Sequence, residues 1–350
     1  MKLSEVAKHA GVSLATVSRI LNNDTSFSVA PETVERVLQS ARELGYEKKS
    51  RKATQKKAAP KPKETLRIGY VLTMTREKFQ DYCFSHIIYG IEQEALDQGY
   101  TIVFSYGESD LENPQVLQTV LSSHIDGLIL IGSIPKQLFK VLSERFPQVT
   151  SIFDSLAESF GIDRITVEFE KPFYELTKLL IERGRRNIAF IGGDLWSSPQ
   201  DIDPIHLFDR HDERFIGYLK AHYNYNIPIN KALIKNAKWE IEESYNLMTE
   251  LLTSGETIDA VAAASDKMAI GAMRAIREFG LTIPDDISII GFDNLETANF
   301  VTPRLTTVDY PKEELGRLAV RILSENITGK SICKGKKMVL PSTLVIRDSI

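Results

Sequence analysis

Residues 4–22 constrain the fold of this chain more than any other stretch. Apolar side chains recur at helical spacing on both sides of Gly11, a residue that ends a helix in the left-handed conformation without a steric penalty. Ser13 follows, and its hydroxyl can accept from the free N–H groups of a new helix. The stretch predicts two short helices joined by a tight turn, a helix-turn-helix whose second helix is shaped to enter the DNA major groove. The inward side chains are Val6, Ala7, Ala10, Val17, Ile20 and Leu21.

The outer face of the second helix carries the side chains that it would offer to DNA. Leu14 and Ala15 stand at its first turn and would contact base edges, with Leu14 against a thymine methyl group. The polar residues after them would contact bases or phosphates. On physical grounds alone, two surface helices without a nucleic-acid role are an alternative. The predicted DNA contacts of this segment are Ser13, Leu14, Ala15, Thr16, Ser18, Arg19 and Asn22.

The string that starts at Leu3, Leu-x-x-Val-Ala-x-x-Ala-Gly-Val-Ser-x-x-Thr-Val-Ser-Arg-x-Leu-Asn, closely resembles the DNA-binding head of the LacI/GalR repressor family. The resemblance runs through nearly the whole chain. A third helix is expected from Pro31 to a stop at Gly45, so residues 1–46 form a small all-α DNA-binding domain. The predicted inner stripe of this helix is Val34, Val37, Leu38, Ala41 and Leu44.

Residues 47–64 change composition abruptly, with eight basic and two acidic residues, two prolines and no large apolar side chain. We expect a linker that is disordered in the free protein. Its cations either add salt-dependent affinity for phosphates or only keep a spacer solvated. Family members usually carry a hinge helix here, with a leucine nine residues after the tyrosine that matches Tyr46. This chain has Gln55 there, which favours a basic arm over leucine insertion. The linker contacts predicted are Lys48, Lys49, Arg51 and Lys52.

The net charge of −4 is unevenly distributed. Residues 1–63 hold 13 Lys/Arg and 6 Asp/Glu, a balance of +7, which leaves −11 on the remainder. A basic front on an acidic body is the balance expected of a DNA-binding head on a body that does not bind DNA.

Length and composition bound the class of protein. A chain of 350 residues exceeds what one core normally serves, so two or three domains are expected. Cys83 and Cys333 lie far apart without CxxC spacing, which disfavours a disulfide framework or a zinc site and fits a reducing cytosol. No run of 18 apolar residues and no apolar signal region are present, so we expect a cytoplasmic protein without a membrane span.

From residue 66 on, strands alternate with helices, which predicts parallel sheets covered by helices on both faces. Two such series imply two Rossmann-like lobes. The resemblance implies a periplasmic-binding-protein-like α/β body over 65–350, in which the chain crosses between lobes three times. The expected N-lobe spans about 65–168 plus 307–328, and the C-lobe about 169–306 plus 329–350. Expected strands are 66–72, 101–106, 126–131, 149–153, 165–169, 187–191, 232–235, 258–263, 286–292 and 337–346; expected helices are 82–98, 114–123, 136–146, 172–183, 211–223, 240–253, 267–279 and 311–326.

In open α/β sheets, ligands bind beyond the carboxyl ends of the strands. A sugar needs charge-assisted hydrogen bonds from carboxylates and arginine together with an aromatic face. Polar residues stand at several of these strand ends. Each has an ordinary structural alternative, such as a helix cap for an aspartate, a surface ion pair for the arginine or core packing for the tryptophan. The candidate effector-binding residues are Thr73, Tyr82, Asp154, Arg214, Trp239, Ser265, Asp293 and Tyr310.

The resemblance assigns roles to several of these residues. Arg214, in Arg-Phe-Ile-Gly-Tyr, matches the family's inducer-binding arginine, and Asp293 matches the aspartate that clamps ligand hydroxyls. Trp239 matches an aromatic that stacks on the sugar. Ser265 stands where many relatives have Asn, and Tyr310 where the lactose repressor has glutamine, so the effector differs. Residues 81–92 and 163–168 resemble the galactose-repressor branch, which points to a galactoside.

Residues 266–278 resemble the family's dimer-interface helix. The chain stops at Ile350 without a heptad tail, which favours a homodimer over a tethered tetramer. The apolar stripe of this helix, wider than one sheet contact needs, is Met268, Ala272, Ala275, Ile276 and Phe279.

Other classes of protein fit less well. The sequence has no GxSxG, no P-loop, no GxGxxG after a strand and no metal-spaced His pair, so we expect no enzyme, no cofactor and no metal. A transport binding protein would need a signal sequence. The leading prediction is a repressor of sugar-utilisation genes, with operator affinity set by a sugar bound between the lobes. The alternative is a catabolite-control regulator governed by a phosphoprotein partner.

Overall fold

The structure is a computed structural model that describes residues 3–21, 29–46, 66–73, 82–193 and 212–350. The chain divides into two compact units, Met1–Glu64 and Thr65–Ile350. The head unit and the body unit each pack around cores of their own.

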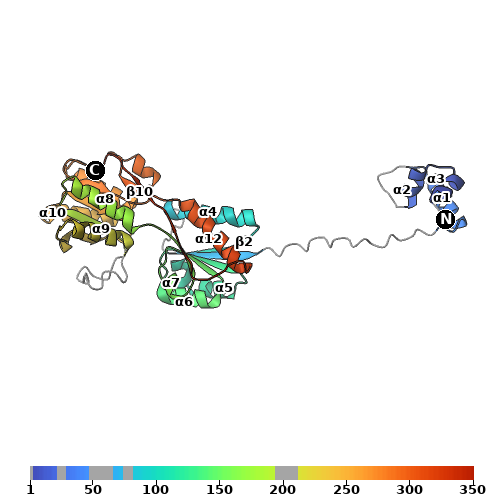
Figure 1. Ribbon diagram of the computed structural model, residues 1–350, viewed down its shortest axis with the longest axis horizontal. Helices are drawn as coiled ribbons and strands as arrows, with labels where there is room; N and C mark the ends of the chain where they lie inside the picture. Colours follow the sequence, from blue (N-terminus) through green and yellow to red (C-terminus); the bar gives the residue numbers. More distant parts are fainter. Residues whose placement is uncertain (1–2, 22–28, 47–65, 74–81, 194–211) are drawn as a thin grey trace. The chain divides into compact units, whose positions relative to one another are not determined.

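The head is a bundle of three helices, α1 (Leu3–Ala10), α2 (Leu14–Leu21) and α3 (Pro31–Glu43) (Figure 1). Val6, Val17 and Val37 are fully buried at its centre, one from each helix. Gly11 adopts a φ of 65° in the turn between α1 and α2, which only glycine takes without strain. The predicted helix-turn-helix is confirmed.

One predicted core position of the head is wrong. Leu38 is 38% exposed, because α3 turns Val37 and Ala41 inward and Leu38 lies about 100° further round the helix. Ser40 is buried in its place, and its hydroxyl lies 3.1 Å from Nδ1 of His9 on α1. The α3 core face is therefore narrower and more polar than predicted.

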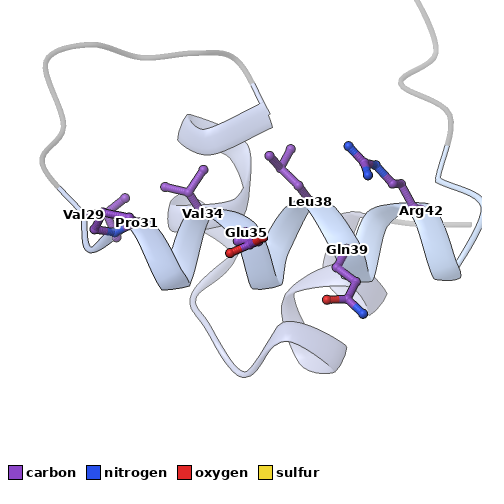
Figure 2. Close-up of a pocket in the computed structure, with 7 residues that line it drawn as sticks. All are labelled: Val29, Pro31, Val34, Glu35, Leu38, Gln39 and Arg42. Carbon is purple, nitrogen blue, oxygen red and sulfur yellow. The ribbon is translucent and has the colours of Figure 1, made fainter.

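An open groove of about 770 Å³ runs along α3. Figure 2 shows Val34, Leu38 and Arg42 pointing the same way from successive turns of the helix. The residues that line the groove are Val29, Pro31, Val34, Glu35, Leu38, Gln39 and Arg42.

The body holds a six-stranded parallel sheet in the order β11-β5-β4-β3-β1-β2. Its two faces belong to different core clusters: Ile68, Tyr70 and Leu72 of β1 pack with the α4 and α12 side, whereas Val71 packs with the α5 and α6 side. The elements are β1 (Arg67–Leu72), β2 (Thr101–Gly107), β3 (Gly127–Ile131), β4 (Val149–Ile152), β5 (Asp163–Val167), β11 (Lys337–Leu340), α4 (Tyr82–Gln98), α5 (Pro114–Ser122), α6 (Lys136–Arg145), α7 (Leu156–Ser159), α12 (Lys312–Ile327) and the 3-10 turn η1 (Glu108–Glu112).

A second parallel sheet has four strands in the order β7-β6-β8-β9. Figure 1 shows α8, α9 and α10 gathered around it. A two-stranded antiparallel sheet of β10 and β12 lies beside β9, since Thr306 bridges to Ile290. The elements are β6 (Ile188–Gly192), β7 (Ile234–Asn236), β8 (Ala260–Ala263), β9 (Ser288–Ile290), β10 (Thr307–Asp309), β12 (Thr343–Val345), α8 (Glu170–Glu182), α9 (Glu213–Asn224), α10 (Ile241–Thr253), α11 (Asp266–Glu278), η3 (Lys231–Leu233) and η4 (Glu296–Asn299).

The expected helices and strands of the body are present, with ends displaced by at most two residues, except the last strand. The single strand expected over 337–346 is two strands in different sheets, β11 and β12. Pro341 lies between them and has no N–H to continue a ladder, so the strand breaks there. Residues 337–340 therefore join the six-stranded sheet and not, as expected, the second lobe. The chain leaves the six-stranded sheet after β5, returns to it after β10 and leaves it again after β11.

Two glycines show how closely the backbones of α4 and α12 approach. A Cβ on Gly90 of α4 would meet the carbonyl oxygen of Glu313, and one on Gly316 of α12 would meet that of Ile87. These glycines allow α4 and α12 to cross nearly in backbone contact.

The stripe predicted to meet a second copy on α11 is wrong for most of its length. Met268, Ala272, Ala275 and Ile276 are all buried in the core of their own chain, where α11 packs on α10, β8 and β9. Phe279 alone of the five is half exposed, because it stands at the end of the helix. The width of the stripe reflects two internal contacts, one with α10 and one with the sheet.

Candidate functional site

The outer face of α2 presents the residues predicted to contact DNA. Leu14 is 51% exposed, and Ala15 and Arg19 are exposed as well. Ser13 caps the helix as predicted, because its Oγ accepts from the N–H of Thr16 at 3.1 Å. Its hydroxyl also lies 2.8 Å from that of Thr16, so this pair is held together at the start of α2. Ser18 is half-buried, which leaves Leu14, Ala15 and Arg19 as the outermost side chains.

Five of the predicted DNA contacts fall outside the described residues and stay predictions. They are Asn22, Lys48, Lys49, Arg51 and Lys52.

Arg214, the second residue of α9, is held in a bidentate ion pair. Its Nε donates to Asp212 at 2.7 Å and its Nη2 donates to the second oxygen of that carboxylate at 2.5 Å. Nη1 donates to the carbonyl oxygen of Ala264, just past β8, at 2.9 Å. Burial by itself lowers the pKa of Arg214, but the Asp212 carboxylate, together with Asp293 and Tyr310, outweighs burial and the pKa is raised. The arginine is a fixed cation in a nearly dry site.

Three aromatic rings surround this guanidinium. Its central carbon lies 4.9 Å from the ring centre of Phe169, 4.7 Å from that of Trp239 and 5.3 Å from that of Phe292. A Cβ on Gly193 would collide with the indole, so the glycine after β6 makes room for Trp239. Aromatic faces attract a cation and also suit the C–H face of a sugar.

Tyr310 and Asp293 form the other side of the site. The Tyr310 hydroxyl donates to Asp293 Oδ1 at 3.0 Å and lies 2.8 Å from Cys83 Sγ on α4. Burial raises the pKa of Tyr310 well above its ordinary value, and Asp293 adds to the shift, so the phenol stays protonated and donates. Asp293 has a φ of 106°, in the region that disfavours side chains. Such strain is found where the surroundings fix a functional residue.

Three candidates at strand ends serve the fold itself. Asp154 is buried and accepts from the N–H groups of Ile134 and Leu156, both at 2.9 Å. Burial raises the pKa of Asp154, and these two hydrogen bonds offset part of that shift. Ser265 caps α11 by accepting from Met268 N at 3.2 Å, and Thr73 donates to the carbonyl oxygen of Ser133 at 2.7 Å. The structural alternative accounts for the polar atoms of Asp154 and Ser265.

Tyr82 lies apart from the Arg214 cluster. It is 39% exposed at the start of α4, and its ring centre is 4.4 Å from that of His86. Both line a groove of about 450 Å³ together with Tyr310 and Lys312. Tyr310 therefore lies both beside Asp293 and in the groove that Tyr82 lines.

Comparisons with known proteins identify the family. Residues 2–49 match the family described as bacterial regulatory proteins, lacI family, and residues 177–350 match the periplasmic binding protein-like domain. The chain is 31% identical to the HTH-type transcriptional repressor MelR of Bacillus subtilis (strain 168) over 350 residues, which covers 100% of this chain and 97% of that protein. The chain belongs to the lacI family of bacterial regulatory proteins.

Solved structures agree with this lacI-family assignment. The transcriptional regulator CelR–cellobiose complex matches with a TM-score of 0.69 and 26% identity over 100% of both chains. The lac repressor dimer bound to operator and the anti-inducer ONPF matches with a TM-score of 0.68 and 26% identity over 100% of this chain and 98% of that one. The predicted resemblance and fold class are confirmed.

This lacI-family chain is thus a DNA-binding transcriptional repressor with a ligand-binding body. The relatives it matches are transcriptional repressors, which are not enzymes. None of the helices in the described residues is long and apolar enough to cross a membrane.

Sequence reasoning missed three side chains of the candidate ligand site, Phe169, Phe292 and Asp212. Phe169 and Phe292 lie just past β5 and β9, where the strand-end rule had selected only polar residues. Asp212 stands two residues before Arg214, at the cap position of α9. Asp266 is fully buried and accepts from Thr307 Oγ1 at 2.5 Å and from Leu295 N at 2.7 Å. Burial, followed by the nearby Asp293, raises its pKa well above the ordinary value.

Proposed function

We propose that this repressor controls sugar-utilisation genes and that a small sugar, a galactoside foremost, sets its affinity for operator DNA. The observation that carries the proposal is the Arg214 site, where a fixed guanidinium is flanked by three aromatic rings and two aspartates. Such a set offers hydrogen bonds to hydroxyls and flat faces to C–H groups. The similarity to a cellobiose complex and to a repressor bound by ONPF supports a ligand of this class.

On the DNA side, we propose that two copies of α2 read the half-sites of a palindromic operator, as a homodimer. Leu14 and Ala15 contact base edges in the major groove, and Thr16, Ser18 and Arg19 contact bases or phosphates. Asn22 and the linker cations Lys48, Lys49, Arg51 and Lys52 add contacts to phosphates or the minor groove. The similarity to a repressor dimer on its operator supports this arrangement.

Ligand binding affects the DNA-binding head by changing the relative position of the two large sheets. Arg164 of β5 lies 3.5 Å from Glu213 at the start of α9, so an ion pair joins the sheets beside Arg214. A ligand that contacts both sides favours one of two arrangements, and it changes the affinity for operator by the same factor by which operator changes the affinity for the ligand.

Operator binding by the full chain tests the proposal. Selection from a pool of random duplexes gives the operator, and a palindromic consensus is expected. Arg19→Ala should weaken binding at least about fivefold at physiological salt, since a base contact contributes about 1–3 kcal/mol. Arg36→Ala, an exposed arginine on α3 that removes the same charge, is the control. Equal binding by the Arg19 variant and the wild type would refute the docking through α2.

A sugar panel then tests the effector. A ligand at 100 times its dissociation constant stabilises a protein by about 2.7 kcal/mol, which is a melting shift of several degrees. We expect one neutral sugar, with methyl β-galactoside tested first, to raise Tm and change operator affinity, and Arg214→Ala and Asp293→Ala to abolish both effects. Control of operator binding by a phosphoprotein, with no response to any sugar, would contradict the proposal and favour catabolite control.

A further inference from the structure

We infer that Asp212 is a specificity-determining residue: it pairs with Arg214 so that the ligand site accepts a neutral, hydroxyl-bearing molecule and rejects an anionic one. The inference rests on the proposed function, because it names the charge class of the effector at that same site. It concerns a residue two positions before the arginine, and it follows from the hydrogen bonds and charges around the guanidinium.

Most of the N–H donors of Arg214 already have acceptors within the protein. Of the five N–H groups of a guanidinium, Arg214 uses two on the carboxylate of Asp212 and one on the carbonyl oxygen of Ala264. Two N–H groups are left for which the described residues give no acceptor. The side chains of Arg214 and Asp212 are 12% and 11% exposed, so water does little to screen the pair. The ligand therefore meets two hydrogen-bond donors whose positive charge is already balanced.

The other charges of the site do not restore a positive potential. Asp293 acts on Arg214 electrostatically from the opposite side, so two carboxylates accompany one guanidinium. The neighbouring cations have carboxylate partners of their own: Lys312 pairs with Asp309 at 3.2 Å, and Arg164 pairs with Glu158 at 2.7 Å. A phosphate or carboxylate ligand on the two remaining N–H groups would lie close to the carboxylates of Asp212 and Asp293. Their repulsion opposes an anion and leaves a neutral hydroxyl unaffected.

Asp212 can be changed without loss of its local structural role. Its Oδ1 accepts from the N–H of Arg214 at 2.9 Å as the cap of α9, and asparagine serves equally well as a cap. Asp212→Asn thus removes the charge and keeps the helix start. The control is Asp348→Asn, because Asp348 forms the same bidentate pair with Arg304, at 2.6 and 3.1 Å, on the exposed surface.

The test compares three full-length proteins by thermal melting in inorganic phosphate, with chloride at matched ionic strength as the reference. We expect phosphate to raise the Tm of Asp212→Asn, with an apparent dissociation constant at least tenfold below that of the wild type, a change of about 1.4 kcal/mol. Asp348→Asn should follow the wild type. Equal responses of wild type and Asp212→Asn, or an equal gain by Asp348→Asn, would overturn the inference.

A sugar pair provides the second readout. Galactose and galactose 6-phosphate are titrated into the wild type and Asp212→Asn, and the variant should shift its preference toward the phosphorylated member. Tighter binding of galactose 6-phosphate than of galactose by the wild type would overturn the inference. Absence of any neutral sugar response in the wild type would count against the proposed function, whereas the phosphate comparison by itself decides the role of Asp212. Asp212→Ser, which also caps helices, replaces the asparagine variant if that protein fails to fold.

Discussion

Removing the hydroxyl of Tyr310 should uncouple the two halves of the ligand site. This hydroxyl is buried, donates to Asp293 Oδ1 at 3.0 Å and lies 2.8 Å from Cys83 Sγ. A hydrogen bond to a charged group contributes about 1.5–3 kcal/mol, and the ring of phenylalanine keeps the packing against Phe153 and Phe292. We therefore expect Tyr310→Phe to lower the free energy of unfolding of the body by about 1.5–3 kcal/mol.

A double-mutant cycle isolates the Tyr310–Asp293 contact from other effects of the substitution. Tyr310→Phe, Asp293→Asn and the double variant are compared by Tm and by affinity for the stabilising sugar. If the hydrogen bond holds Asp293 in its strained conformation, the two substitutions couple by about 0.5–3 kcal/mol in stability. Additive losses, within about 0.5 kcal/mol, would refute the reasoning and leave Tyr310 as a core side chain only.

Two further predictions concern the body of the protein. Gly316→Ala should lower Tm by several degrees, because a Cβ there would meet the carbonyl oxygen of Ile87. The cost of this clash, about 1–3 kcal/mol, exceeds the gain of about 1 kcal/mol in helix propensity. An unchanged or higher Tm would show that α4 and α12 separate freely. The free energy of unfolding should fall as pH drops below 6.5, because burial lowers the pKa of His222 in the folded state and the unfolded chain binds more protons; His222→Asn should flatten this part of the pH profile, and an unchanged slope would assign it to other groups.

The sequence predicts the order of the elements well because each carries its own local signal. The head could be derived from Gly11, from the Ser13 cap and from apolar spacing in two helices. The βα alternation of the body could be derived from short buried strands between amphipathic helices. These signals act over a few residues, so the ends of the body elements fall within two residues of those expected.

The features that could not be predicted from the sequence are those that depend on which elements become neighbours in the fold. Residues 337–346 alternate as one strand, and only pairing reveals that the chain changes sheets at Pro341. The α11 stripe was interpreted as a partner surface because its internal neighbour α10 is invisible in periodicity. Arg214 could be found from its motif, but the rings of Phe169 and Phe292 come from separate loops that meet it only in the fold.

The proposed ligand site lies where the two large sheets are joined. Phe169 lies on the first crossing segment and Tyr310 on the second. The third is fastened to the first, since Ser342 Oγ donates to the carbonyl oxygen of Glu168 at 2.9 Å and Glu168 N donates to that of Leu340 at 3.1 Å. Phe169 and Tyr310, which we propose to contact the ligand, are therefore carried by segments that connect the two large sheets. A ligand that packs on Phe169 and Arg214 directly changes the relative energy of the two arrangements of the sheets. It can therefore select one arrangement of the body without a chain of contacts through either sheet.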